Sequence, residues 1–195
     1  MKQLPNFISI FRTMLAIVIS FIVLDNPHNE KILFGAFLLT WFVIILDGVD
    51  GIIARKLNLT SDFGAFFDIA CDRIIELIYL LLFAVLRWIP FLILIIFLVR
   101  GVLVDGIRGF ALREGKTAFG EKSMMQSKLG LFLTSSRFTR ASYGTIKAIA
   151  FALMFMAQNQ WSCVLDIEMF LIYLMTFYCI IRGVPVLVEG RKFFS

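Results

Sequence analysis

Six long apolar segments constrain the fold of this chain more than any other feature of its sequence. Each is close to the roughly 20 residues that an α-helix needs to cross the hydrocarbon core of a bilayer. Because lipid offers the backbone no hydrogen-bond partner, segments of this kind must be helical. The chain is 60% hydrophobic, whereas soluble domains are usually about half apolar. The sequence therefore predicts an all-α integral membrane protein, one domain over residues 1–195, with six transmembrane helices over residues 4–24, 32–57, 62–85, 88–112, 141–157 and 169–188.

The positions of the basic residues predict the orientation. Lys and Arg are concentrated in the loop 113–140, just before the turn near residue 57 and at the C-terminus, whereas the opposite loops hold only Lys31 and Arg87. Cytoplasmic loops carry an excess of Lys and Arg, so both termini and the two basic loops are expected to face the cytoplasm. Residues 122–139 mix Met, Leu and Phe with Lys, Ser and Arg, which predicts an interfacial helix along the membrane surface.

Composition and motif content exclude several classes of function. The net charge of +5 is modest, and the basic residues gather at the ends of apolar segments, as expected for contact with anionic lipid rather than with nucleic acid. The three cysteines have neither disulfide-framework nor zinc-site spacing. The sequence contains no P-loop, no dinucleotide fingerprint and no Ser-His-Asp set. Because the first apolar segment lacks a small-x-small cleavage site, it is interpreted as a retained helix rather than a signal peptide.

Four aspartates lie inside the second and third apolar segments. Acidic residues within membrane helices are costly, and their default interpretation is functional. Asp47 and Asp50 are three residues apart, and Asp68 and Asp72 are four apart, so each pair lies on one face of its helix. The turn between the segments is short, which predicts an antiparallel hairpin. At about 1.5 Å per residue, the first pair lies roughly 14 and 9 Å inward from the turn and the second about 9 and 15 Å inward, so the two pairs have matching depth.

Four carboxylates at one depth would repel one another strongly. Protonation, basic partners or metal ions would relieve that repulsion. A site made only of oxygen ligands, with acidic groups among them, suits hard cations such as Mg²⁺ or Mn²⁺. Because such ions commonly neutralise the phosphates of a substrate, the sequence predicts a metal site for a phosphate-bearing ligand.

Small and basic residues accompany the aspartates. Gly51 and Ala54 lie on the Asp47 face, and Gly64 lies one turn before Asp68. Small side chains serve close helix packing, and they also leave room for a flat ligand, so both interpretations stay open. Arg55 would lie at the cytoplasmic end of its helix, where it would reach lipid headgroups or hold a phosphate.

Together these residues form one extended motif. Residues 47–55 read DGVDGIIAR, eight residues follow, and residues 64–72 read GAFFDIACD. The stretch resembles the signature of the CDP-alcohol phosphotransferase family, D-x2-D-G-x2-A-R-x8-G-x3-D-x3-D, at every fixed position. Eight fixed positions within 26 residues, in a membrane context, are far more specific than a lone short motif.

The resemblance implies an activity. Members of this family transfer a phosphatidyl or similar group from a CDP-linked donor, here CDP-diacylglycerol, to an alcohol and release CMP. It also implies that two divalent ions, Mg²⁺ or Mn²⁺, hold the donor diphosphate, and that the chain forms a homodimer in a bacterial inner membrane with its active site open to the cytoplasm. The metal ligands implied by the motif are Asp47, Asp50, Asp68 and Asp72, with Asp72 also deprotonating the acceptor. The implied donor-binding residues are Gly51, Ala54, Arg55 and Gly64.

The acceptor alcohol is predicted from basic residues in the second half of the chain. Arg100 and Arg108 are eight residues apart, and a Gly-x-x-Lys sequence ends at Lys147. This pattern is similar to bacterial phosphatidylglycerophosphate synthases, whose acceptor is glycerol 3-phosphate, although Thr145 stands where those proteins favour a second Lys. The candidate ligands of the acceptor phosphate are Arg108, Lys147, Arg137 and Arg140.

Each of these assignments has an alternative. Asp105 is available to pair with Arg108 on the same helix, and Arg137 and Arg140 also fit the general excess of cytoplasmic cations. The stretch from Arg137 to Arg140 resembles relatives that use inositol phosphate, and serine, ethanolamine phosphate or a cardiolipin-type acceptor also stays open. A cation transporter that uses the membrane aspartates is a different class of function. A non-catalytic scaffold is a third class, which would leave four buried acids unexplained.

Overall fold

The computed structural model describes residues 4–56, 62–113, 115–116, 123–158 and 165–193. Within these ranges, the side chains of residues 4–5, 47–56, 62–63, 65–66, 137, 165 and 193 lie outside the description.

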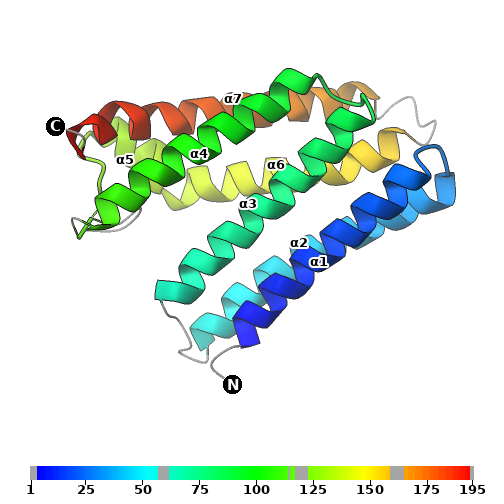
Figure 1. Cartoon of the computed structure of the whole chain (residues 1–195), viewed down its shortest axis with the longest axis horizontal. Coiled ribbons are helices and arrows are strands. Elements are labelled where there is room, and N and C mark those ends of the chain that lie inside the picture. Colours follow the sequence, from blue (N-terminus) through cyan, green and yellow to red (C-terminus); the bar gives the residue numbers. More distant parts are fainter. Residues whose placement is uncertain (1–3, 57–61, 114, 117–122, 159–164, 194–195) are drawn as a thin grey trace. The chain divides into compact units, whose positions relative to one another are not determined.

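Helices make up almost all of the described chain (Figure 1). The predicted all-α class is confirmed, and every predicted apolar segment coincides with a helix whose ends agree within a few residues. By length and apolar composition alone, two stretches in the described part, Asn6–Asp25 and Asp166–Gly190, are able to cross a membrane. A six-span topology stays a prediction. The helices are α1 (Leu4–Asp25), α2 (Glu30–Lys56), α3 (Asp62–Val85), α4 (Phe91–Arg113), α5 (Lys128–Ser135), α6 (Arg137–Ala157) and α7 (Leu165–Gly190), with a short 3-10 helix, η1 (Arg191–Phe193), at the end.

The predicted helix over residues 122–139 is divided in the structure. The Ser127 side chain accepts a hydrogen bond from the Gly130 N–H and so begins α5. Ser136 has an extended backbone, with φ −64° and ψ 142°, which ends α5. Its hydroxyl then accepts a hydrogen bond from the Thr139 N–H at 3.1 Å and caps the start of α6. A helix therefore lies within the predicted range but covers only Lys128–Ser135, because the Ser127 and Ser136 side chains compete with the helical backbone on either side of it. Its position along the membrane surface stays a prediction.

The chain divides into two compact units. One unit comprises Met1–Phe91 and Phe151–Glu168, and the other comprises Leu92–Ala150 and Met169–Ser195. We call them the aspartate unit and the cationic unit, after the charged residues described below.

In the aspartate unit, α1 packs against both α2 and α3 (Figure 1). An aromatic cluster lies where α3 meets the end of α6. The Phe83 and Phe155 ring centroids are 5.3 Å apart, and those of Tyr79 and Phe151 are 5.6 Å apart. The Tyr79 hydroxyl lies 3.2 Å from the Thr40 hydroxyl of α2. These edge-to-face ring contacts, together with the hydrogen-bonded Tyr79 hydroxyl, stabilise the packing of α3 against its neighbours.

The end of α3 is closed by a hydrogen-bonded turn. The Trp88 N–H donates to the Phe83 carbonyl at 2.8 Å, and the Arg87 N–H donates to the Ala84 carbonyl at 3.1 Å. Arg87 has φ 61°, in the left-handed region, and the Trp88 and Phe83 rings stack at 5.8 Å. These are the bonds and the apolar contact of a Schellman motif, which satisfies carbonyls that the helix leaves without intrahelical partners.

In the cationic unit, α4 and α7 approach each other closely. A Cβ atom on Gly190 would collide with the Ile107 side chain, so any other residue there would force this contact to shift. Glu189 accepts hydrogen bonds from the backbone N–H of Gln126 and from the Ser127 hydroxyl. These bonds fix the start of α5 beside the end of α7. The buried apolar core of this region consists of Val104, Ile107, Ala111, Met124, Met125 and Val186.

Candidate functional site

The motif aspartates are distributed over α2 and α3. Asp47 and Asp50 lie in the second half of α2, together with Gly51, Ala54 and Arg55. The helix is continuous through this part of the motif, as the spacing predicts. The side chains of residues 47–56 lie outside the described residues.

Asp68 and Asp72 lie one turn apart on α3. Each side chain keeps 42% of its surface exposed. Their carboxylates provide hard oxygen donors of the kind that Mg²⁺ and Mn²⁺ prefer, so they fit the predicted metal. Among the residues whose side chains are described, no three metal-ligating groups come together. The predicted set needs Asp47 and Asp50 as well, and those side chains lie outside the description.

An arginine that sequence reasoning missed joins these two aspartates. Nη2 of Arg12, in α1, lies 2.8 Å from Oδ1 of Asp68, and its Nη1 lies 3.3 Å from Oδ1 of Asp72. The Ser9 hydroxyl, one turn earlier on α1, donates to the same Asp68 oxygen at 3.1 Å. The Arg12 side chain is only 2% exposed. A signal was present, because an arginine within an apolar segment is a functional candidate by default.

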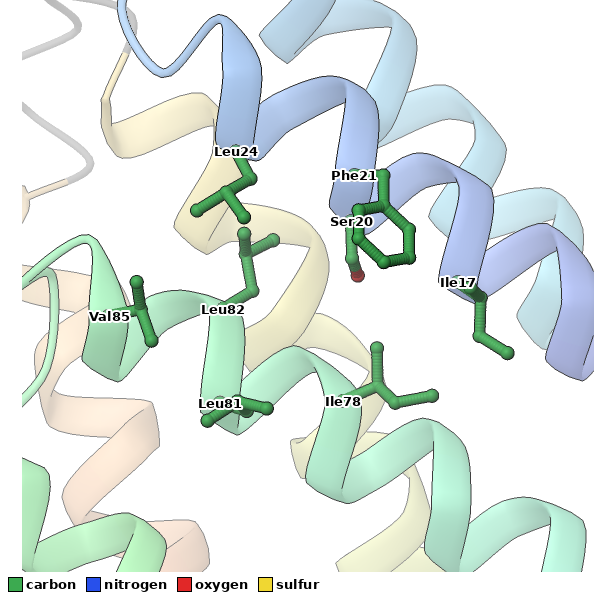
Figure 2. A pocket seen from close by; sticks show the side chains of 8 residues that line it. All are labelled: Ile17, Ser20, Phe21, Leu24, Ile78, Leu81, Leu82 and Val85. Carbon is green, nitrogen blue, oxygen red and sulfur yellow. The ribbon is translucent and has the colours of Figure 1, made fainter.

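An apolar groove lies between the same two helices (Figure 2). It has a volume of about 200 Å³. Its one polar residue, Ser20, donates its hydroxyl to the Ala16 carbonyl at 2.8 Å, so the groove presents apolar atoms only. On α3 the groove begins at Ile78, six residues beyond Asp72 or about 9 Å along the helix. Its lining residues are Ile17, Ser20, Phe21, Leu24, Ile78, Leu81, Leu82 and Val85.

Four basic side chains of the cationic unit lie near one another, and two of them lie over the ring of Tyr143. The Arg182 guanidinium carbon lies 4.9 Å from the Tyr143 ring centroid, and Nζ of Lys147 lies 5.7 Å from it. Arg100 and Arg140 both act electrostatically on Arg182. We call Arg100, Arg140, Tyr143, Lys147 and Arg182 the Tyr143 cluster. Like charges this close favour an anionic ligand.

Two arginines of the Tyr143 cluster are held tightly. Arg182 is only 8% exposed, and its Nε has no hydrogen-bond partner among the described residues. Arg100 packs against the bare backbone of Gly183, because its Cγ would lie 3.0 Å from a Cβ placed there. Its Nε is likewise buried without a hydrogen-bond partner in the described part of the chain. A guanidinium group held in this way matches the geometry of a phosphate.

The predicted acceptor ligands have different surroundings. Lys147 and Arg140 belong to the Tyr143 cluster. Nη1 of Arg108 lies 3.9 Å from Oδ1 of Asp105, the pairing that the spacing of three allows. The side chain of Arg137 lies outside the described residues. Arg182 was missed, although a lone arginine in the last apolar segment was a visible signal.

Comparison with known proteins gives the family of the chain. The sequence model of the CDP-alcohol phosphatidyltransferase family matches residues 2–184. This match contains the whole aspartate motif and all members of the Tyr143 cluster.

Curated bacterial proteins are similar to this chain. The CDP-diacylglycerol–glycerol-3-phosphate 3-phosphatidyltransferase of Mycoplasma genitalium is 31% identical over 126 residues, which cover 56% of this chain and 53% of that protein. The protein of the same name from Rickettsia typhi is 38% identical over 116 residues, covering 56% of this chain and 61% of that protein. The chain thus spans about half the length of the curated relatives it matches.

The fold is similar to that of Mycobacterium tuberculosis phosphatidylinositol phosphate synthase in its apo form. The TM-score is 0.59 with 20% identity, and the alignment covers 95% of this chain and 87% of that one. This likeness concerns the fold alone. From the family match over residues 2–184, together with the motif, this chain belongs to the CDP-alcohol phosphatidyltransferase family.

Proposed function

We propose that the chain transfers a phosphatidyl group from CDP-diacylglycerol to glycerol 3-phosphate and releases CMP. The observation that carries the proposal is the family match over residues 2–184, which contains every motif aspartate. The names of the curated relatives from Mycoplasma and Rickettsia support glycerol 3-phosphate as the acceptor.

The donor is assigned to the aspartate motif. Asp47, Asp50, Asp68 and Asp72 would hold two divalent ions, Mg²⁺ or Mn²⁺, which supply positive charge against the donor diphosphate. The donor nucleotide is assigned to Gly51, Ala54, Arg55 and Gly64, on the resemblance to the family.

The proton transfer is assigned to Asp72. An alcohol is a poor nucleophile, so a carboxylate within reach of the acceptor hydroxyl is a sensible general base. Asp72 accepts the hydroxyl proton, the hydroxyl oxygen bonds to the phosphorus that carries diacylglycerol, and the bond from that phosphorus to CMP breaks. Partial exposure of Asp72 supports this role, because the base must meet a ligand.

The acceptor phosphate is assigned to the Tyr143 cluster. Arg182 and Arg100 offer buried guanidinium donors, and guanidinium groups match phosphate geometry. Lys147 and Arg140 add charge at the same place. Arg108 and Arg137 stay candidates for binding the acceptor phosphate, ranked after the residues of the Tyr143 cluster.

Replacing Arg182 with glutamine is expected to raise the apparent KM for glycerol 3-phosphate about 10- to 100-fold. This factor corresponds to the usual free energy of a hydrogen bond to a charged group. The KM for CDP-diacylglycerol should change much less, because the substitution touches one substrate. Steady-state kinetics with each substrate varied in turn measures both constants. Arg191→Gln, which removes an exposed cation from η1, is the matched control. Equal effects on both constants would contradict the assignment.

The apolar groove is proposed to hold part of an acyl chain of the donor. It shares α3 with Asp68 and Asp72, and its lining is apolar apart from Ser20, whose hydroxyl is bonded to a backbone carbonyl. Leu81→Trp should fill it and raise the apparent KM for long-chain CDP-diacylglycerol about tenfold, equivalent to losing contact with roughly two methylene groups. A short-chain donor should be affected less. Leu38→Trp, at an equally exposed position of α2, is the control. An equal rise in KM for long-chain and short-chain donors would contradict the assignment of the groove to an acyl chain.

The membrane location rests on apolar exposure as well as on helix length. Large apolar side chains are exposed along α1, α4 and α7, including Phe7, Met14, Leu92, Val102 and Phe170. Patches of this extent mark a membrane or a protein interface. The predicted six spans, cytoplasmic termini, bacterial inner membrane and homodimer are proposed with it.

A cation transporter is the second class of function, and one contact weighs against it. Glu76, the acid one turn beyond Asp72, is 2% exposed and lies 2.7 Å from Arg73 on the same helix. An ion pair of this kind gives Glu76 a structural partner rather than a place in an ion path.

The identity of the lipid product tests the proposal. Purified protein in detergent would receive labelled CDP-diacylglycerol, Mg²⁺ and one of several acceptors: glycerol 3-phosphate, inositol phosphate, serine or free glycerol. Glycerol 3-phosphate should give the fastest product formation. Preference for an acceptor without a phosphate would refute the assignment of the Tyr143 cluster, and cation flux without lipid product would favour the transporter.

A further inference from the structure

Arg12 is held by carboxylates of a helix other than its own. Its side chain is only 2% exposed, and its two carboxylate partners, Asp68 and Asp72, belong to α3. Burying a guanidinium is costly unless it is paired and hydrogen-bonded. The position of Arg12 is therefore better explained by the two carboxylates than by helix packing.

The contact constrains the two aspartates as a pair. A guanidinium is planar, so the distance between Nη1 and Nη2 is fixed. Nη2 binds Asp68 and Nη1 lies beside Asp72, and each uses Oδ1 of its aspartate. The rigid group thus limits how far apart the two Oδ1 atoms lie. The Ser9 hydroxyl, 3% exposed and bonded to the same Asp68 oxygen, adds a second fixed donor.

Arg12 covers only one side of the carboxylate pair. Asp68 and Asp72 keep 42% of their side-chain surface exposed although Arg12 is buried. A ligand that approaches from the exposed side would meet two carboxylates whose spacing is already restricted. Hydrogen bonds to metal-ligating carboxylates from outside the metal's own coordination are known to orient the ligands and tune the site.

We propose that Arg12, together with Ser9, is a positioning residue that holds Asp68 and Asp72 in the arrangement a divalent cation requires, and that it stays in place when the cation binds. The inference rests on the proposed metal site. If Arg12 swung away instead, a guanidinium would be buried without carboxylate partners, and the cost of that state opposes the movement. Arg12 also supplies a positive charge that lowers the repulsion between the two carboxylates.

Mn²⁺ binding to the purified protein in nonionic detergent, without donor or acceptor, tests the proposal by calorimetry. Arg12→Gln should weaken Mn²⁺ affinity about 10- to 100-fold, the usual effect of removing a group that supports a metal ligand. The Mn²⁺ affinity of Arg12→Lys should lie between those of Arg12→Gln and the unchanged protein. An ammonium keeps the positive charge but lacks the two donors at a fixed separation that a guanidinium has. Arg113→Gln, which removes an exposed cation from α4, should bind Mn²⁺ normally.

Helix content by circular dichroism identifies variants that fail to fold. If Arg12→Gln does not fold, Arg12→Lys and Ser9→Ala carry the test, since each retains most of the local volume. Unchanged affinity in the folded variants would overturn the role of Arg12 while leaving the metal site intact. Tighter Mn²⁺ binding would also overturn it, because Arg12 would then compete with the cation. No Mn²⁺ binding by the unchanged protein would refute the proposed metal site itself.

Discussion

Asp68→Asn is expected to lose almost all phosphatidyl transfer while keeping its helical fold. Asp68 is assigned as a metal ligand, and the Arg12 and Ser9 contacts both converge on its Oδ1 atom. An asparagine at this position removes one negative charge from a shared cation site, and metal ions contribute several kcal/mol to the stabilisation of transferring phosphates. Several kcal/mol correspond to a loss of about 10²- to 10⁴-fold.

Two measurements separate this loss from unfolding. Turnover is measured over a range of Mg²⁺ concentrations, and helix content is followed by circular dichroism. Asp25→Asn, which changes an exposed acid at the end of α1, should keep normal turnover. Near-normal turnover in Asp68→Asn at ordinary Mg²⁺ would contradict the assigned site.

Asp72→Asn is expected to separate donor binding from catalysis. If Asp72 is chiefly the general base, three carboxylates remain to hold metal and CDP-diacylglycerol, so donor binding should persist. Transfer should still fall about 10²- to 10⁴-fold, the usual contribution of general acid–base catalysis. Donor binding is measured by thermal shift with CDP-diacylglycerol at saturating Mg²⁺, alongside turnover.

Asp47→Asn is the comparison for Asp72→Asn. It removes a residue assigned only as a metal ligand, so donor binding and turnover should be lost together. If Asp72→Asn loses donor binding as completely as Asp47→Asn, the base assignment has no independent support, and Asp72 becomes one more ligand.

The helices could be predicted from the sequence because their length is set by a simple physical requirement. An apolar segment near 20 residues must be helical in lipid, and its ends are marked by polar or basic residues. The third segment, residues 62–85, was predicted with both ends correct. The spacing of Asp68 and Asp72 then places them on one face of α3 without any tertiary information.

The interruption at Ser136 could not be predicted from apolar pattern. Residues 128–139 keep a mixed polar and apolar composition throughout, so periodicity gives no boundary there. The boundary arises because the Ser136 hydroxyl bonds the Thr139 N–H while its own backbone is extended. A serine caps some helix starts in this way and lies within the helix elsewhere, and the packing around it determines which of the two occurs.

The contacts of the charged residues could be predicted within one helix but not between helices. The Arg108–Asp105 contact was foreseen, because a spacing of three within one helix determines which side chains meet. The Arg12–Asp68 contact joins residues 56 positions apart, and the Tyr143 cluster joins α4, α6 and α7. Such contacts depend on which helix faces pack together, which one sequence does not specify.

The most direct test of the account measures CMP and lipid product together as a function of divalent cation. Purified protein in detergent would be given CDP-diacylglycerol and glycerol 3-phosphate, first after exhaustive chelation and then with Mg²⁺ or Mn²⁺ restored. No reaction is expected in the chelated sample, and equal amounts of CMP and phosphatidylglycerol phosphate are expected once the cation returns. Transfer that continues at its full rate under exhaustive chelation would contradict the central claim that the aspartates of α2 and α3 act through a metal.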